Sequence, residues 1–276
     1  MSSLYKATQE NIIKMNSVEN NISTDKKKLK IYTVASAAIA VILAFIGVLA
    51  SVPSSEARSR YFENHALATC LYVALALMVA FALSAFFAFK RTTLVTDNVK
   101  SSALRFLNLC PAIALIICSI VSAASNTALG LRVGVATICV LSAIGCMSKA
   151  FKLPDTVKII CGYAQVLFLI FIIVSLYVER SIEINCPFKL LVQFAAAALM
   201  LEALTDMRGI LYGCRARMFV FSKTLSLSMC LLTGCVIVYT FASGNKVFDK
   251  SYLAYSIYFL CNSLCAYLSL KSASAE

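Results

Sequence analysis

Long apolar runs separated by short polar segments are the dominant pattern of this 276-residue chain. Each of eight runs comes close to the ~20 residues that a helix needs to cross ~30 Å of hydrocarbon. The predicted helices cover approximately residues 31–52, 66–89, 106–125, 133–148, 156–178, 188–206, 219–242 and 251–270. The fourth and sixth runs are the weakest, because a charged residue shortens each of them. The pattern predicts an all-α, polytopic membrane protein with about eight transmembrane helices.

The polar segments divide the chain into three parts: a polar and basic tail at residues 1–30, the helical bundle at 31–270 and a short tail at 271–276. In the first tail, Leu4, Ile12, Met15 and Ile22 recur at roughly helical spacing, which is compatible with a helix lying on the membrane surface. A disordered tail is the alternative. The connections between runs are too short to form a soluble domain, so any activity must be built from the helices and their loops.

Composition supports the same class of protein. Hydrophobic residues make up 61% of the chain and charged residues only 14%. A soluble domain of this length needs a larger charged surface. The formal net charge of +12 could indicate nucleic-acid binding, but no basic stripe alternates with stacking aromatic residues. We therefore expect no nucleic-acid partner.

The basic residues also predict the orientation. With the N-terminus inside, the inner segments hold 18 of the 25 Lys and Arg residues and the outer loops hold seven. Cytoplasmic loops of membrane proteins carry such an excess of Lys and Arg. An odd number of spans would mix the two sets of loops. The distribution thus favours eight spans with both termini in the cytoplasm.

Residues that carry catalysis or bind metals are scarce. The twelve Cys residues lie mostly inside apolar runs and form no Cys-x-x-Cys pair, as expected for small, polarizable hydrophobic side chains. His65 is the single histidine, which excludes a histidine-based zinc site. The chain contains no Gly-x-Ser-x-Gly, His-Glu-x-x-His or phosphate-loop motif. We expect no metal, no cofactor and no catalytic residue, and the chain is more typical of a protein that is not an enzyme.

Glu202 is the least ordinary residue, because it lies where a span should still be inside lipid. Only about a dozen uncharged residues precede it in the sixth run. To cross the bilayer, the helix must include Glu202 and extend to about Asp206, with Lys189 reaching outward to the membrane surface. An acid inside a span costs about 2–3 kcal/mol near the centre of the bilayer. Glu202 should therefore face protein, near the cytoplasmic side.

The helical spacing gives Glu202 a face and a set of candidate partners. Ala195, Ala198, Glu202 and Asp206 recur at intervals of three and four residues, so two carboxylates share one stripe with small residues. Lys158, Arg105 and Lys223 begin other spans at the same depth. We expect Lys158 to be the partner, because the fifth and sixth helices form one hairpin and Lys158 shares a face with Gln165. These five charged residues form the predicted binding site: Glu202, Asp206, Lys158, Arg105 and Lys223.

Two further features bear on partners. Arg208, Arg215 and Arg217 follow the site on the inner side, where such cations attract anionic lipid headgroups. Small residues at four-residue spacing allow helices to approach closely, and they occur at Ala76, Ala80, Ser84 and Ala88. Such a face could join helices within one bundle or two copies of the chain, so a homo-oligomer stays an open alternative.

The sequence leaves three classes of function. The favoured class is a transport or permeation protein in which Glu202 and its cationic neighbours couple or gate the movement. The second class is a non-catalytic interaction or assembly subunit, and the third is a lipid-modifying enzyme that uses Glu202 and Asp206. The short loops favour a cytoplasmic or plasma membrane of bacterial origin. An ion pair that only fixes the register of two helices is the simplest alternative for Glu202 itself.

Overall fold

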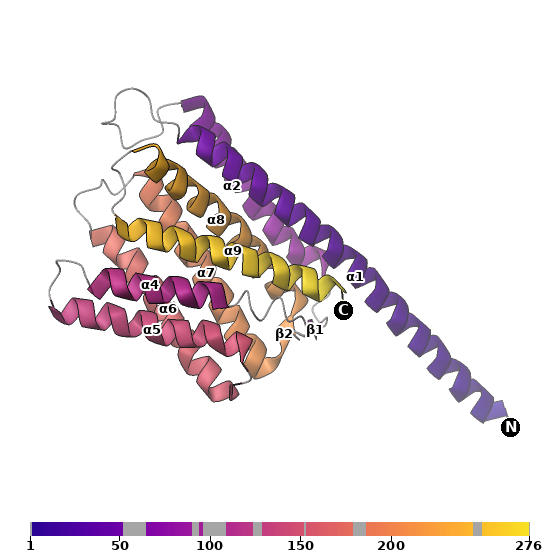
Figure 1. The fold of residues 1–276 in the computed structure, drawn as a ribbon. Helices are drawn as coiled ribbons and strands as arrows, with labels where there is room; N and C mark the ends of the chain where they lie inside the picture. Colours follow the sequence, from indigo (N-terminus) through magenta and orange to yellow (C-terminus); the bar gives the residue numbers. More distant parts are fainter. Residues whose placement is uncertain are drawn as a thin grey trace.

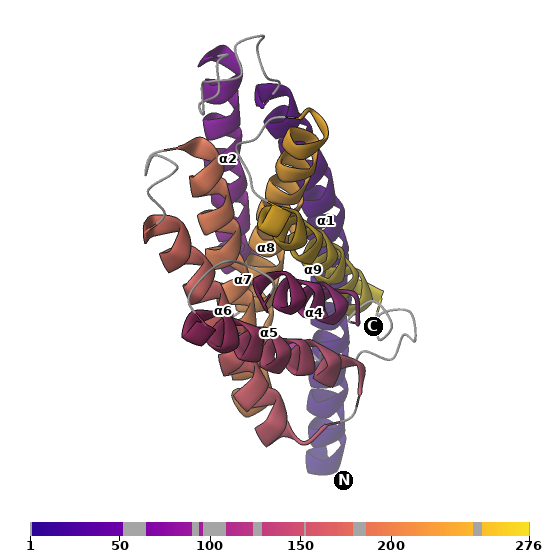
Figure 2. The same cartoon turned by 60° about the vertical axis from the view of Figure 1, so that its left-hand side comes forward.

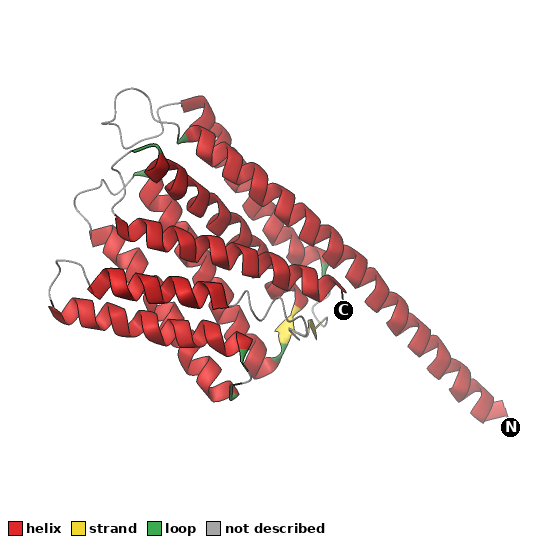
Figure 3. Cartoon of the chain, viewed as in Figure 1, coloured by secondary structure: helices red, strands yellow, loops and turns green. Residues whose placement is uncertain are grey.

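The computed structural model describes residues 2–51, 65–89, 94–95, 109–123, 129–151, 153–178, 186–244 and 250–275. Within these residues the chain is all-α apart from one short ribbon of two strands (Figures 1 and 3). The helices are α1 (Ser2–Ala50), α2 (His65–Ala88), α4 (Leu109–Ala123), α5 (Leu129–Ala150), α6 (Asp155–Val178), α7 (Pro187–Tyr212), α8 (Ala216–Ala242) and α9 (Lys250–Ala275). The strands are β1 (Leu94–Val95) and β2 (Cys214–Arg215).

Each predicted apolar run coincides with a helix, and six of the helices are long and apolar enough to cross a membrane. They are α2, α6, α7, α8, the Lys26–Ala50 part of α1 and the Tyr252–Ser274 part of α9. The polypeptide supplies all backbone hydrogen bonds within such helices, which is the condition for crossing lipid. The six helices indicate a multi-pass integral membrane protein.

The third and fourth predicted spans do not meet that standard within the described residues. There, their apolar stretches are Leu109–Ile120 in α4 and Ala136–Met147 in α5. The 15 residues of α4 rise about 22 Å, less than the ~30 Å of a hydrocarbon core. The prediction of eight helices is thus confirmed, whereas the length and composition of a membrane span are found in six of them.

The N-terminal tail is helical. Helix α1 is continuous from Ser2 to Ala50, and the position of the tail relative to the membrane stays a prediction. Figure 1 shows its first part extending beyond the end of the bundle in line with the membrane-spanning part. The tail and the first span therefore form one element.

The helices α4 to α9 form a closed ring. Each contacts the next one along the chain, and α9 contacts α4 to complete the ring. Helices α1 and α2 pack together on the outside of this ring, α2 against α8 and α1 against both α8 and α9 (Figures 1 and 2). The ring contains fully buried aromatic side chains, among them Phe168, Tyr258 and Phe259. Helix α8 thus lies at the centre of the molecule, between the ring interior and the outer pair.

A tight connection joins α7 to α8. Helix α7 begins at Pro187, a residue whose fixed φ suits the first turn of a helix. It ends where Gly213 takes a φ of 79° and donates its N–H to the carbonyl of Gly209, a backbone conformation that glycine adopts without strain. Residues 214–215 then pair with β1 in antiparallel register. Because the connection is so short, α8 folds straight back along α7.

Candidate functional site

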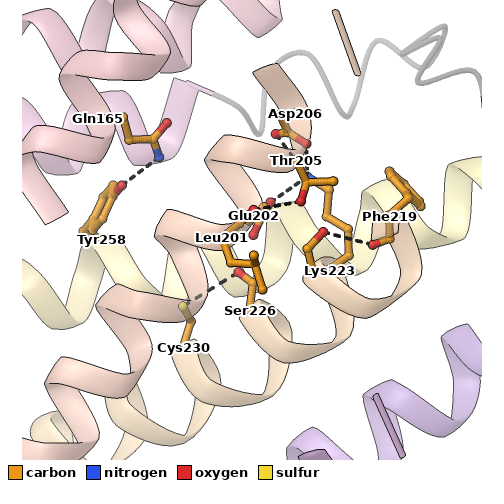
Figure 4. Close-up of polar contacts among 11 residues, drawn as sticks. Gln165, Leu201, Glu202, Thr205, Asp206, Phe219, Lys223, Ser226, Cys230 and Tyr258 are labelled. Atoms are coloured by element: carbon orange, nitrogen blue, oxygen red, sulfur yellow. Dashed lines mark hydrogen bonds and ion pairs between the residues drawn. The ribbon is translucent and has the colours of Figure 1, made fainter. Parts of the chain in front are cut away.

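Three charged side chains meet between α7 and α8, and we call Glu202, Asp206 and Lys223 the ion triad. The Lys223 ammonium donates to Oε1 of Glu202 at 2.6 Å. It also lies 3.1 Å from Oδ1 of Asp206 and donates to Oδ2 of the same carboxylate at 3.3 Å. Figure 4 shows the lysine reaching from α8 to both acids on α7. One cation therefore serves two carboxylates.

The local sequence explains why these residues meet. Glu202 and Asp206 are four residues apart on α7, so they project from the same face. Ala195 and Ala198 on that face are buried, and their small side chains allow α8 to approach closely. Lys223 lies seven residues beyond Ala216, at which α8 begins. The short turn and the small-residue stripe thus bring the lysine to the depth of the two acids.

The ion triad is almost completely removed from solvent and lipid. The side chains of Lys223, Glu202 and Asp206 are 3%, 9% and 13% exposed. Moving charged groups out of water costs several kcal/mol for each ion, so every charge needs good partners. Oε1 of Glu202 has one in Lys223, but its second oxygen, Oε2, is buried and has no hydrogen-bond partner among the described residues. A buried acceptor without a donor is a costly feature.

Lys223 has one further contact and Glu202 has one oxygen to spare. Lys223 lies 5.8 Å from the centroid of the Phe219 ring, a weaker contact with an aromatic face. Oε2 of Glu202 has no hydrogen-bond donor among the described residues, so it can accept a proton. Chemically, the site can therefore hold and release a proton.

A second set of polar side chains lies deeper in the bundle, next to the ion triad. Ser226 and Cys230, one and two turns beyond Lys223 on α8, contact each other at 4.0 Å. Across the ring, Nε2 of Gln165 on α6 donates to the hydroxyl of Tyr258 on α9 at 3.0 Å (Figure 4). The polar interior thus extends beyond the ion triad.

The sequence prediction was wrong about the partner of Glu202. Lys158 lies in the first turn of α6 and binds Asp155 three residues earlier, at 2.9 Å. This pair is exposed, with 29% of the lysine side chain and 70% of the aspartate side chain accessible. Asp155 lies in the same helical turn as Lys158, so these two side chains can pair whatever the packing of the other helices. Lys223 takes the place expected for Lys158, and Arg105 lies outside the described residues.

Lys189 also differs from its predicted placement. It was expected to reach outward to the membrane surface, but only 1% of the residue is exposed. The neighbouring Cys186, Pro187 and Phe188 are buried as well. The start of α7 is therefore packed inside the protein, and the lysine is covered with it.

The three arginines after the ion triad have different environments. Arg208 and Arg215 are exposed. Arg217 is half-buried, and its Nε donates to the carbonyl of Phe89 at 2.7 Å. Lys28 of α1 donates to the adjacent carbonyl of Ala88 at 3.3 Å. Cations at the C-terminal end of a helix satisfy its last carbonyls and the helix dipole, so Arg217 and Lys28 join α8 and α1 to the end of α2.

The small residues predicted to form one face of α2 have different environments. Ser84 is half-buried and bonds to the hydroxyl of Tyr32 at 2.6 Å. Ala76 and Ala80 are exposed. The first contact joins α2 to α1 within one chain, whereas the exposed residues leave the prediction of a homo-oligomer untested.

Tyr258 and Ser226 are the residues of the polar interior that the sequence prediction missed. Gln165 was predicted to share the face of Lys158, but it bonds to Tyr258 on α9. The signal in the sequence was the series Tyr252, Tyr255 and Tyr258, which continues from the predicted end of the last span into its middle. Tyrosines that mark a membrane interface would stop at the end of the helix.

No metal site is formed by the part of the chain whose side chains are described, because no three His, Cys, Asp or Glu residues gather there. No disulfide joins any of the twelve cysteines in the structure. No protein-family model, curated protein or solved structure matches the chain. The function must therefore be inferred from the geometry of the ion triad and its surroundings.

Proposed function

We propose that this protein is a membrane transport or permeation protein that moves protons through the ion triad, either alone or together with a solute. The observation that carries the proposal is the second oxygen of the buried Glu202 carboxylate. Glu202 keeps one oxygen, Oε2, buried without a hydrogen-bond donor among the described residues. Ionisable residues inside a membrane commonly mark pathways for ions or protons. Glu202 is the proton-binding group of the proposed site.

Protonation would change the contacts between α7 and α8. A proton on Oε2 neutralises Glu202 and weakens its attraction for Lys223, which keeps Asp206 as its counter-ion. Among the described residues, Lys223 binds Glu202 directly and Asp206 binds the same lysine. In a low-dielectric interior, a change of one charge alters these interactions strongly. Binding and release of the proton would thus be coupled to the packing of the two helices.

A purely structural ion pair provides the main alternative. Such a pair is most stable when each charge has one counter-charge and every oxygen accepts a hydrogen bond. The attraction between two buried charges offsets the cost of their desolvation only if their geometry is excellent. Glu202 departs from this arrangement, because its Oε2 is buried without a hydrogen-bond donor among the described residues. That departure favours a site that changes its protonation over one that only fixes the register of the helices.

The proposal can be tested in liposomes that contain the purified protein and a trapped pH-sensitive dye. A potassium diffusion potential, negative inside, drives protons inward once valinomycin is added. We expect proton influx above that of protein-free liposomes. The Glu202→Gln variant keeps the shape of the side chain but cannot bind the proton, so influx should fall at least about tenfold.

The matched control is Asp155→Asn, which converts an exposed carboxylate of the same chain to an amide. Its influx should equal that of the parent protein. If the parent and Glu202→Gln liposomes both leak protons only as fast as protein-free liposomes, the proton pathway is absent. That result would favour the assembly subunit, or the lipid-modifying enzyme if lipid products appear in the same vesicles.

The proposal extends to the lipids that the protein binds and to the membrane in which it lies. We propose that the exposed Arg208 and Arg215 bind anionic lipid headgroups on the cytoplasmic side, which would increase influx in vesicles that contain phosphatidylglycerol. We also keep the cytoplasmic or plasma membrane of a bacterium as the location, with both termini in the cytoplasm. The excess of Lys and Arg in the inner segments supports this orientation.

A further inference from the structure

Asp206 is the acid of the ion triad that lies nearest to the turn between α7 and α8. It follows Glu202 by four residues on α7, which is about 6 Å along the helix axis. Its side chain is 13% exposed, compared with 9% for Glu202. One turn further on, residues 210–213 are all exposed. The protein surface at this turn is therefore closer to Asp206 than to Glu202.

The opposite direction along α7 offers Glu202 no comparable neighbour. Residues 190–201, which precede it, include no titratable side chain. Ala195 and Ala198 occupy the stripe that Glu202 and Asp206 share, and both are buried. Asp206 is therefore the nearest titratable residue on the same face of α7, and it lies on the side of the α7–α8 turn.

Lys223 joins the two acids through short contacts. Its ammonium donates to Oε1 of Glu202 at 2.6 Å. The same nitrogen lies 3.1 Å from Oδ1 of Asp206 and donates to Oδ2 at 3.3 Å. An ammonium has three N–H donors, so it can bond to both carboxylates at once. The polar contacts from Asp206 through Lys223 to Glu202 are thus continuous (Figure 4).

We propose that Asp206 takes up protons at the α7–α8 turn and passes them to Glu202 through Lys223. The inference rests on the proposed function and names the group that supplies Glu202 with its proton. Nζ of Lys223 gives a proton to Oε1 of Glu202 and then takes the proton of the Asp206 carboxyl group. One N–H bond and one O–H bond break and one of each forms, so no group is oxidised or reduced. Asp206 is again a carboxylate, Lys223 is again an ammonium, and Glu202 holds the proton.

The experiment uses the Asp206→Asn variant of the full chain in the same dye-loaded liposomes. Asparagine keeps the size of the side chain but cannot carry a proton. We expect proton influx to fall about tenfold or more, since the relay has lost its first group. The matched control is Asp155→Asn, the same substitution at an exposed carboxylate, which should conduct like the parent. Unchanged influx in folded Asp206→Asn would overturn the relay and leave Glu202 as the proton site.

A second measurement separates a relay from a residue that only holds Lys223 in place. The carbonyl stretch of protonated Glu202 is the infrared band that is missing from Glu202→Gln. After a rapid jump to a pH that protonates Glu202 fully, this band should appear about tenfold more slowly in Asp206→Asn than in the parent but reach the same height. A lower band that appears at the parental rate would overturn the relay. A parent protein without influx would overturn the relay together with the proposed function.

Discussion

Helices α8 and α2 are both long apolar helices, but they occupy opposite environments. Of the most apolar window in α8, 61% is buried inside the protein, compared with 22% for α2. The more hydrophobic of the two helices, α2, is the more exposed. Its exposed large side chains include Leu77, Leu83 and Phe87, which would face lipid in a membrane. In a water-soluble protein, the more hydrophobic of two helices would be the more buried one.

The difference between the two helices comes from their polar side chains. Lipid is as apolar as leucine, so apolar surface gains little from being buried between helices. Hydroxyl and charged groups, in contrast, must be covered by protein. Helix α8 buries many of them: Ser222, Lys223, Thr224, Ser226, Ser228, Thr233 and Thr240. In this protein, polarity rather than hydrophobicity predicts which helix is central.

The largest change should come from removing the cation of α8. The Lys223→Met variant removes the ammonium that binds Glu202 and Asp206 and leaves both acids buried. Breaking a buried ion pair in this way lowers the free energy of unfolding by about 3–5 kcal/mol. Reversible unfolding in mixed micelles, followed by circular dichroism, measures this loss of free energy of unfolding. Lys158→Met removes the cation of an exposed pair and should cost less than about 1 kcal/mol. Equal losses would mean that the ion triad is not buried as described.

A matched pair of leucines tests the packing of the two helices. Leu232 of α8 is fully buried and Leu77 of α2 is 66% exposed. Leu232→Ala should lower the free energy of unfolding by about 3 kcal/mol, because it leaves a cavity. Leu77→Ala leaves a gap that lipid or detergent fills, so its effect should be much smaller. If the two variants were equally stable, the assignment of inner and outer helices would be wrong.

Two glycines extend the comparison to backbone contacts. A Cβ at Gly234 of α8 would lie 2.6 Å from Cγ of Leu260 and 3.3 Å from the Ser256 carbonyl oxygen, whereas a Cβ at Gly134 of α5 has open space around it. We expect Gly234→Ala to destabilise the protein by about 1–2 kcal/mol through overpacking. Gly134→Ala should stabilise it by about 0.5–1 kcal/mol, because alanine is the better helix former. Opposite signs in the same unfolding assay would sharpen the comparison.

Threonine hydroxyls should show the smallest difference. The hydroxyl of Thr224 on α8 lies 3.0 Å from that of Ser36 on α1. Thr69 of α2 instead donates to the carbonyl of His65 in its own helix. Thr224→Val should cost about 0.6 kcal/mol, the usual strength of a hydrogen bond between membrane helices. Thr69→Val should be close to neutral. A larger cost for Thr69→Val would show that α2 makes polar contacts outside this chain.

The sequence predicted much of this arrangement, and particular residues explain where it stopped. Helix positions follow from apolar runs, and the stripe of Glu202 and Asp206 follows from helical spacing. Lys223 was among the candidate partners, but its choice over Lys158 depends on the rotation of α8 about its axis, which apolar runs do not encode. The link between Gln165 and Tyr258 joins helices far apart in the sequence. Such a contact depends on the closure of the ring.

The short turn between α7 and α8 also bears on how the protein enters its membrane. Glu202 and Asp206 are only 21 and 17 residues away from Lys223 along the chain. Closing so short a loop costs little entropy, so the two helices can form a hairpin with its charges already paired before either is surrounded by lipid. Insertion as a pair then avoids carrying a lone acid or lone lysine into hydrocarbon. The connection at Gly213 would thus assist biogenesis as well as the finished site.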